Sequence, residues 1–172
     1  GDEGKEGMRV VLDTVIFVRA LINPHGKWGR LLFEFSDHYV VVLSPEIIRE
    51  ILSVLYRPSL QRRFRQMAEP LHVGQTLAVL EEAEVVEPSK RLSVCRDPDD
   101  DKFFECAVEG RAQYIVSEDR DILHVGEFEG VKTIAADELI RLVSGKLPEP
   151  PKGAVHPRVR LPIDFEESAR VI

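Results

Sequence analysis

Acidic residues occur at four separate places in the chain where the neighbouring residues predict a strand end or a helix. Asp13 directly follows the apolar run MRVVL, and Asp119 lies two residues beyond the apolar run QYIVS. Three consecutive aspartates at 99–101 precede the helical stretch KFFECA. Glu50 lies inside SPEIIREIL, where the helical spacing puts it at the border of the apolar face.

Carboxylates that a fold brings together repel one another near neutral pH. Either their pKa values rise, or a divalent cation lies among them. Oxygen ligands without a neighbouring histidine or cysteine favour Mg²⁺ or Mn²⁺ over Zn²⁺. Such an ion can activate a water molecule and neutralise the phosphate that the water attacks. The acids therefore indicate metal-dependent phosphodiester chemistry, provided that they converge.

Each acidic position also has an ordinary structural interpretation. Asp13 could cap the helix that follows it, and Glu50 could be a solvated helix residue. The sequences DPDDD and SEDRD are typical of turns and helix N-caps. Capping does not require all four positions to meet, however, so their joint occurrence at strand and helix ends favours a common site.

Alternating strand and helix patterns define the elements that would position these acids. Ser44 as N-cap and Pro45 in the first turn predict the start of a helix over 45–56. That helix is expected to bury Ile47, Ile48, Ile51, Leu52 and Leu55. The other helical patterns are 14–22, 27–36, two within 59–82 broken near Pro70, a stretch starting near Lys102, and 136–144. The expected strands are 8–13, 39–43, 84–86, 113–117 and 131–134.

This order predicts an α/β fold: three α/β/α layers with a central, mostly parallel sheet of about five strands. In such a sheet, ligands collect outside the carboxyl ends of the strands. Asp13 and Asp119 follow two of these ends. The fold class thus gives a physical reason for the acids to converge.

Composition restricts the class of protein. The chain has 172 residues, of which 44% are hydrophobic and 31% charged, which fits one globular domain. A net charge of −7 argues against a module that only binds nucleic acid. The apolar runs are too short to cross a bilayer, and two cysteines without a CxxC pair suggest reduced thiols in the cytoplasm. We expect a leader or expression scar over 1–7, a domain over 8–145, and a proline-rich tail over 146–172.

Four motifs together resemble the PIN-domain family over roughly residues 8–144. VLDTV is similar to the family's strand ending in Asp-Thr-Asn, and SPEIIREI to its helix carrying a glutamate. RDPDDDKF is close to RDPDDNKF, found in a subgroup described as toxin–antitoxin nucleases, and VSEDRDIL is similar to V-T-x-D-x-D-[LF]. The resemblance is to VapC-like ribonucleases, which are toxins of type II toxin–antitoxin pairs.

The resemblance implies an Mg²⁺- or Mn²⁺-dependent endoribonuclease that cleaves single-stranded RNA and leaves 5′-phosphate ends. It also implies an antitoxin partner protein and a homodimer. The implied catalytic acids are Asp13, Glu50 (with Glu46 as the weaker alternative), Asp100 and Asp119, of which Asp13, Asp100 and Asp119 contact the metal. Thr14, Ser117 and Asp121 would be auxiliary residues.

One position departs from the family pattern, because Val15 replaces the asparagine after Asp-Thr. That asparagine resembles a residue that holds a neighbouring acid or metal-bound water in place, which valine cannot do. The alternative function is therefore a catalytically weak or silent PIN domain that binds RNA or another protein. A phosphotransfer protein fits poorly. Haloacid-dehalogenase-like enzymes need Asp-x-Asp at the strand end, and Asp13-Thr14-Val15 lacks the second aspartate. Receiver domains need a lysine after a late strand, whereas Lys132 lies within a strand.

A basic run follows the 45–56 helix. The sequence RPSLQRRFRQ could follow an RNA backbone near the acidic site. Its alternative is a solvated helix face. The candidate RNA-binding residues are Arg57, Arg62, Arg63 and Arg65.

Overall fold

A six-stranded sheet forms the centre of the molecule. The structure is a computed structural model and describes residues 7–66 and 73–145. The strand order is β3-β2-β1-β4-β6-β5, and every neighbouring pair is parallel except β5 with β6. The strands are β1 (Met8–Leu12), β2 (Tyr39–Leu43), β3 (Glu84–Val85), β4 (Tyr114–Val116), β5 (Glu127–Phe128) and β6 (Val131–Ile134).

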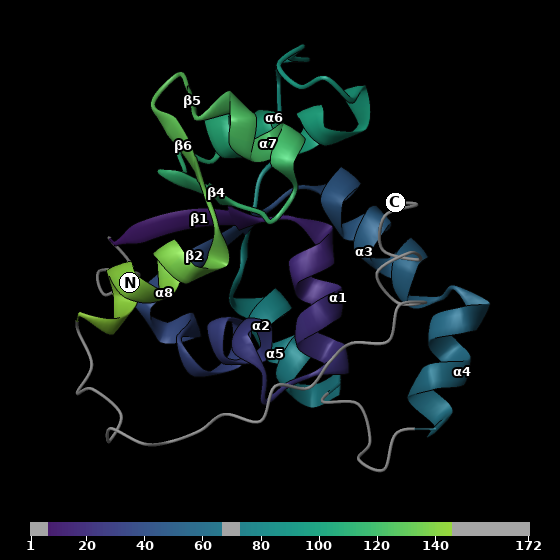
Figure 1. The fold of residues 1–172 in the computed structure, drawn as a ribbon. Helices are drawn as coiled ribbons and strands as arrows, with labels where there is room; N and C mark the ends of the chain where they lie inside the picture. Colours follow the sequence, from purple (N-terminus) through teal and green to yellow (C-terminus); the bar gives the residue numbers. More distant parts are fainter. Residues whose placement is uncertain (1–6, 67–72, 146–172) are drawn as a thin grey trace.

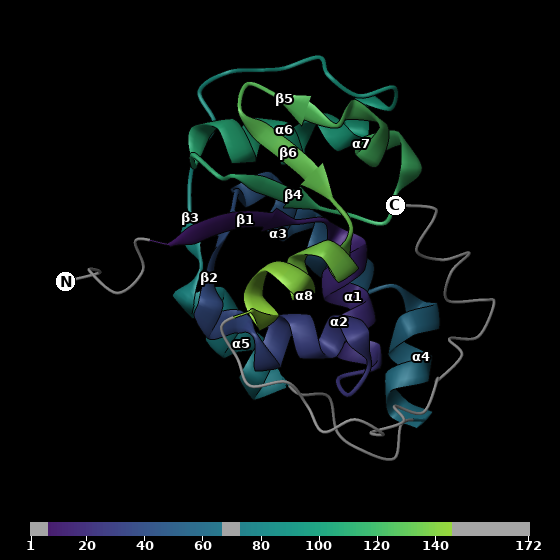
Figure 2. The same ribbon diagram turned by 60° about the vertical axis from the view of Figure 1, so that its left-hand side comes forward.

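Helices cover both faces of this sheet, which confirms the predicted three-layer α/β/α fold. Two of them, α6 and α7, lie on one face, and α1, α2, α5 and α8 lie on the other (Figures 1 and 2). The helices are α1 (Thr14–Ile22), α2 (Lys27–Gly29), α3 (Pro45–Leu55), α4 (Pro58–Gln66), α5 (Val73–Glu82), α6 (Asp101–Glu109), α7 (Arg120–Val125) and α8 (Ala136–Ser144).

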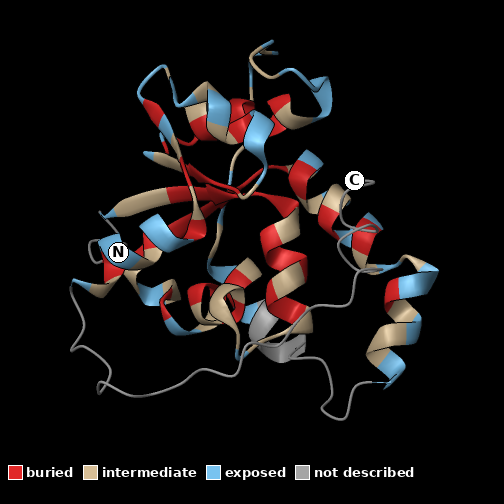
Figure 3. Cartoon of the chain, in the orientation of Figure 1, coloured by how far each residue is buried: buried red, intermediate tan, exposed pale blue. Residues whose placement is uncertain are grey.

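Local sequence accounts for most of these elements. The β1 and β2 sequences, MRVVL and YVVVL, are rich in β-branched residues, and every β2 residue is buried. Ser44 caps α3 by accepting a hydrogen bond from Ile47 N at 3.3 Å, and Pro45 occupies the first turn. Buried residues accordingly concentrate along the strands and on the inward faces of the helices (Figure 3).

Two local expectations were wrong, and two short elements were not expected. The 27–36 stretch is not one helix, because α2 is followed by a π-helical turn over Arg30–Glu34 and a 3₁₀ turn over Ser36–His38. The short helix α7 and the short strand β5 were not expected. Leu52 is 44% exposed rather than buried, because α3 turns Ile47, Ile51 and Val54 toward the interior instead.

A small second apolar cluster attaches α4 to the body. Val18 of α1, Val54 of α3 and Leu60 of α4 are its buried members, and Val15 and Phe64 pack against them. Beyond this contact, α4 lies beside α1 and away from the sheet (Figures 1 and 2). Val15 therefore serves the packing of α1 against its neighbouring helices.

Three sequence expectations lie outside the described residues: the leader except Gly7, the break near Pro70, and the 146–172 tail. No helix in the described ranges combines the length and apolar character that crossing a membrane requires.

Candidate functional site

The carboxyl ends of β1 and β4 lie next to each other in the sheet. Leu12 pairs with Val116, and the Asp13 N–H donates to the Val116 carbonyl at 3.1 Å. The chain passes from β1 to β2 on one side and returns later to β4 on the other side. The sheet order therefore reverses between β1 and β4, which is where ligands bind in open α/β sheets.

A cavity of about 600 Å³ opens at this reversal and is lined mainly by charged residues. It brings together all four acids that the sequence singled out, with Thr14 and Val15 beside them. The lining acids are Asp13, Glu50, Asp97, Asp100, Glu118 and Asp119, and the lining cations are Arg19, Lys102 and Arg120.

Asp13 has both of the roles considered for it, because it caps α1 and lines the cavity. Its side chain is buried, and Oδ1 accepts a hydrogen bond from Ile16 N at 3.0 Å. The Ser117 hydroxyl donates to Asp13 Oδ2 at 2.5 Å and accepts from Asp119 N at 2.9 Å. Ser117 is fully buried, so it joins the ends of β1 and β4 from beneath the cavity.

The cavity raises the pKa values of two of its acids. Burial raises the pKa of Asp13 to about 6, although hydrogen bonds from Ser117 and Ile16 and the nearby Arg19 charge oppose this. Burial, followed by repulsion from Asp119 and Asp97, raises the pKa of Asp100 to about 7. A bound cation would relieve this unfavourable charge.

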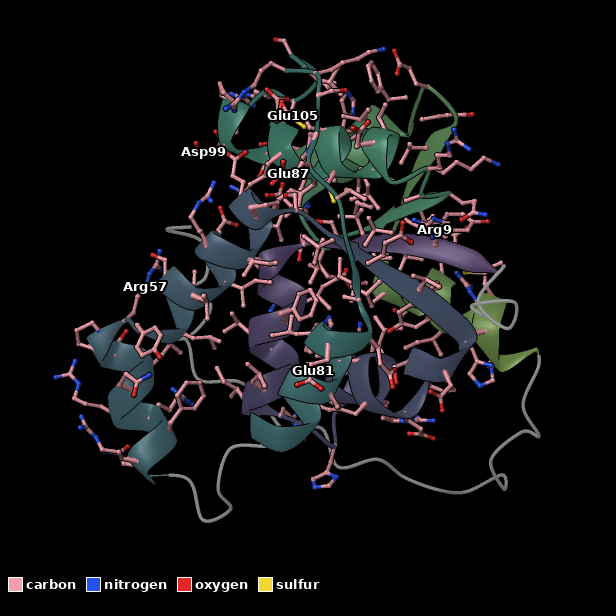
Figure 4. The ribbon with its side chains drawn as sticks, turned by 180° about the vertical axis from the view of Figure 1, so that it is seen from behind. Arg9, Arg57, Glu81, Glu87, Asp99 and Glu105 are labelled. Carbon is pink, nitrogen blue, oxygen red and sulfur yellow. The ribbon has the colours of Figure 1, made fainter. Side chains whose placement is uncertain are left out.

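The three consecutive aspartates before α6 have three different surroundings. Asp99 is exposed on the loop (Figure 4). Asp100 lines the cavity. Asp101 is buried, and its Oδ1 accepts hydrogen bonds from Val94 N at 3.0 Å and Cys95 N at 2.8 Å. Of the three, only Asp100 faces the cavity, because one step along a helix turns a side chain by about 100°.

Glu50 is held by two neighbours. Thr14 Oγ1 donates to Glu50 Oε1 at 2.5 Å, and Lys102 forms an ion pair with Oε2. Lys102 is itself only 8% exposed. Glu46 instead lies on the exposed side of α3, 3.9 Å from Arg91, and does not line the cavity.

Several predicted residues lie away from the cavity wall. Asp121 is exposed, and its N–H donates to Asp119 Oδ1 at 2.8 Å. None of the candidate RNA-binding arginines lines the cavity. Figure 4 shows one of them, Arg57, at the junction of α3 and α4.

Five charged lining residues were not singled out from the sequence as candidates for the site. The positions of two of them in the sequence could have indicated a role at the site. Lys102 directly follows the three consecutive aspartates, and Arg19 follows Val15 by four residues and so shares its helix face. The others lie next to predicted acids and had no separate signal. The five residues are Arg19, Asp97, Lys102, Glu118 and Arg120.

The donor set of the cavity suits a hard divalent cation that keeps part of its water shell. Among the described residues, no three acidic, histidine or cysteine side chains converge closely enough to enclose an ion by themselves. Mg²⁺ commonly binds through one or two carboxylates, several waters and substrate phosphates. Asp13 and Asp100 carry oxygen atoms that could serve as ligands of this kind, and a bound cation would lower their raised pKa values.

The chain resembles known proteins in sequence and in fold. The family model described as PIN domain matches residues 9–121. The uncharacterized protein MJ1680 of Methanocaldococcus jannaschii is 33% identical over 117 residues, which are 67% of this chain and 74% of that protein.

Two solved structures resemble the chain to different degrees. The crystal structure of PAE2754 from Pyrobaculum aerophilum has a TM-score of 0.52 at 17% identity, covering 83% of this chain and 94% of that one. The crystal structure of VapBC2 from Rickettsia felis, bound to a DNA fragment from its promoter, has a TM-score of 0.48 at 15% identity. The match covers 74% of this chain and 98% of that one.

Proposed function

The chain belongs to the PIN domain family, and from this premise we propose that it is a Mg²⁺- or Mn²⁺-dependent endoribonuclease that cleaves single-stranded RNA. PIN domains are generally nucleases. The observation that carries the proposal is the shared cavity at the β1–β4 edge, which Asp13, Glu50, Asp100 and Asp119 line together.

In this proposal the four acids have different roles. Asp13, Asp100 and Asp119 would hold the cation, some of them through its bound water, and Ser117 fixes Asp13 and Asp119 relative to each other through its hydroxyl. When bound, the cation supplies an activated water and neutralises charge on the phosphate. Glu50 does not need to bind the cation directly, because Thr14 and Lys102 occupy its two oxygens.

Val15 is compatible with an active site of this kind. The family's asparagine would hold a neighbouring acid in place, and Glu50 is already held by Thr14 Oγ1 and Lys102. Val15 instead packs against the α1–α3–α4 cluster. We therefore propose that the chain is catalytic despite the substitution.

The basic helix α4 could contact the part of the RNA that lies outside the cavity. Arg62 and Arg65 are exposed on a helix that extends from the α3 side of the molecule. Arginines placed outside the cavity would hold the RNA backbone without taking part in cleavage. Arg57 and Arg63 complete this proposed contact surface.

We further propose that the protein acts in the cytoplasm as the toxin of a toxin–antitoxin pair. A segment of an antitoxin protein would cover the acidic cavity and exclude RNA. Support comes from the family membership and from the RDPDDDKF motif. Expression of the chain alone should arrest growth, and expression of Asp100→Asn should not.

Cleavage of a labelled single-stranded RNA with Mn²⁺ tests the proposed activity. Asp13→Asn and Asp100→Asn should each lower the rate at least a hundredfold, because each removes a charged ligand from the cavity. Asp99→Asn is the matched control, since it removes the same charge from the exposed neighbour and should leave the rate unchanged. Equal rates in all four proteins would refute the assignment.

The second candidate function is a silent PIN domain that binds RNA or a protein, and Val15 is the observation that favours it. A silent domain predicts no RNA cleavage by the native chain and cleavage after Val15→Asn. It also predicts that Mn²⁺ leaves the melting temperature unchanged, whereas an ion bound only to the folded state raises it.

A further inference from the structure

Arg19 has an unusual position in the cavity wall. It lies on α1, four residues after Val15, so both side chains share the helix face that lines the cavity. Its guanidinium carbon stands 4.7 Å from the centre of the Trp28 ring. Its Nε atom is buried and has no hydrogen-bond partner among residues 7–66 and 73–145. The guanidinium charge acts on the nearby Asp13 carboxylate, but no hydrogen bond or ion pair joins the two side chains.

A buried N–H without an acceptor is costly, because this donor has lost water and gained no partner in return. A planar group with several donors matches a phosphate or a carboxylate. We propose that Arg19 binds an RNA phosphate, namely the phosphate next to the scissile phosphate in the same strand. This assignment rests on the proposed ribonuclease function and adds a substrate-binding residue to it.

Of the three lining cations, Arg19 is the one best arranged for this contact. Lys102 is already paired with Glu50 and is only 8% exposed. Arg120 is exposed at the start of α7, and no aromatic ring of the described residues holds it. Arg19 combines an unbonded Nε donor with a position fixed by the Trp28 ring.

Trp28 fixes the position of Arg19, and its own position is fixed by α2. A Cβ at Gly29 would lie 2.0 Å from the Pro24 carbonyl oxygen, so the α2 backbone packs directly on the preceding turn. Lys27 lies 4.9 Å from the Trp28 ring centre and pairs with Asp137 at 3.5 Å. An arginine ordered before binding loses less entropy when it meets a phosphate.

The position of Arg19 also suits an RNA strand that passes over the cavity acids. Arg19 lies six positions after Asp13, which corresponds to about 9 Å along a helix axis. Six acids and three cations line the cavity, so it repels a polyanion unless positive charge is supplied locally. The cation bound by the acids would supply charge at one phosphate, and Arg19 would supply it at the next.

Trp28 also provides the test, since it is the single tryptophan of the chain. The native protein is titrated with a short single-stranded oligoribonucleotide in Ca²⁺, an oxygen-binding cation that the acids can hold in place of Mg²⁺ or Mn²⁺. Gels verify that the RNA stays intact during the titration. Binding is followed by tryptophan fluorescence and by the anisotropy of the labelled RNA, at several salt concentrations. The variants are Arg19→Met, Arg19→Lys and, as the matched control, Arg141→Met on the exposed face of α8.

We expect Arg19→Met to weaken binding roughly tenfold and to reduce the slope of log K against log salt by about 0.7. Arg19→Lys should retain most of the salt slope but bind less tightly than the native chain. Arg141→Met should match the native chain in both measurements. Melting curves identify any variant that fails to fold, and Arg19→Lys then carries the comparison.

Two outcomes would overturn the assignment, and they differ in what they leave standing. If Arg19→Met binds like the native protein while the native protein cleaves RNA with Mn²⁺, the Arg19 assignment fails and the proposed function stands. If the native protein neither binds nor cleaves RNA, both fail.

Discussion

Asp13 shows how one carboxylate can have a structural and a chemical role together. It caps α1 through Ile16 N and lines the cavity, and the Ser117 hydroxyl bonds its second oxygen. Burial that would favour a neutral acid is opposed by these hydrogen bonds. The residue is therefore kept at the border between its protonated and charged forms.

This balance predicts how the stability of the metal-free protein depends on pH. Asp13 has a pKa of about 6 when folded and an ordinary value of 3.8, so the folded state binds the proton more tightly. Its stabilising contribution is full below pH 4 and is lost as the pH rises through 6. The difference corresponds to about 3 kcal/mol as an upper value.

Urea unfolding in EDTA at pH 4.5 and 7.5 measures this effect. The native protein should lose more stability between the two pH values than Asp13→Asn, which cannot titrate. Asp100 contributes in the same direction up to about pH 7. Identical pH dependence in the native protein and Asp13→Asn would contradict the prediction.

At the scale of elements, the start of α6 contributes both to the cavity and to the position of the segment before the helix. Asp100 precedes it on the cavity side. Asp101 and Glu105 lie one turn apart and accept hydrogen bonds from the segment before the helix, at Cys95 N, Val94 N and Leu92 N. This contact fixes the path of the chain that leads to Asp97 and the acidic cavity.

Removing this support should loosen the segment without removing a cavity acid. We expect Asp101→Ala to lower the free energy of unfolding by about 1–3 kcal/mol, because two backbone donors lose their acceptor. Hydrogen exchange at the amides of Val94 and Cys95 should accelerate. Asp99→Ala, at an exposed neighbouring position, should change neither measurement.

At the scale of the whole molecule, the outer face of α3 exposes large apolar side chains. Leu52 is 44% exposed and Tyr56, which follows α3 by one residue, is 74% exposed. They lie four residues apart and therefore on the same side. We propose that these two side chains lie in the interface of a homodimer, because exposed apolar side chains that are grouped together often mark a protein–protein contact.

Light scattering after gel filtration tests this interface. We expect the native chain to have the mass of a dimer and the double variant Leu52→Glu/Tyr56→Glu to have the mass of a monomer, because charges placed there cannot be buried. Leu142→Glu, on the partly exposed face of α8, is the matched control and should remain a dimer. A native chain with the mass of a monomer would contradict the proposal.

The sequence by itself determined the layers and the strand ends that carry the acids. Apolar β-branched runs, the Ser44-Pro45 helix start and the alternation of elements depend on local patterns, and such patterns can be read along one chain. Two acids could be assigned to one edge because parallel strands end together. The short elements α7 and β5 were not predicted, because six residues carry little periodicity and Glu127–Phe128 lacks the β-branched residues that indicated the equally short β3.

Only the tertiary structure decided which side chains meet inside the cavity. The direction of Asp100 rather than Asp101, the pairing of Lys102 with Glu50, and the stacking of Arg19 on Trp28 depend on how helices rotate and pack. Those rotations follow from contacts between residues far apart in the chain, such as the packing of Val15 and Val18 on Val54. No local pattern encodes such contacts, because they arise only when separate elements are brought together.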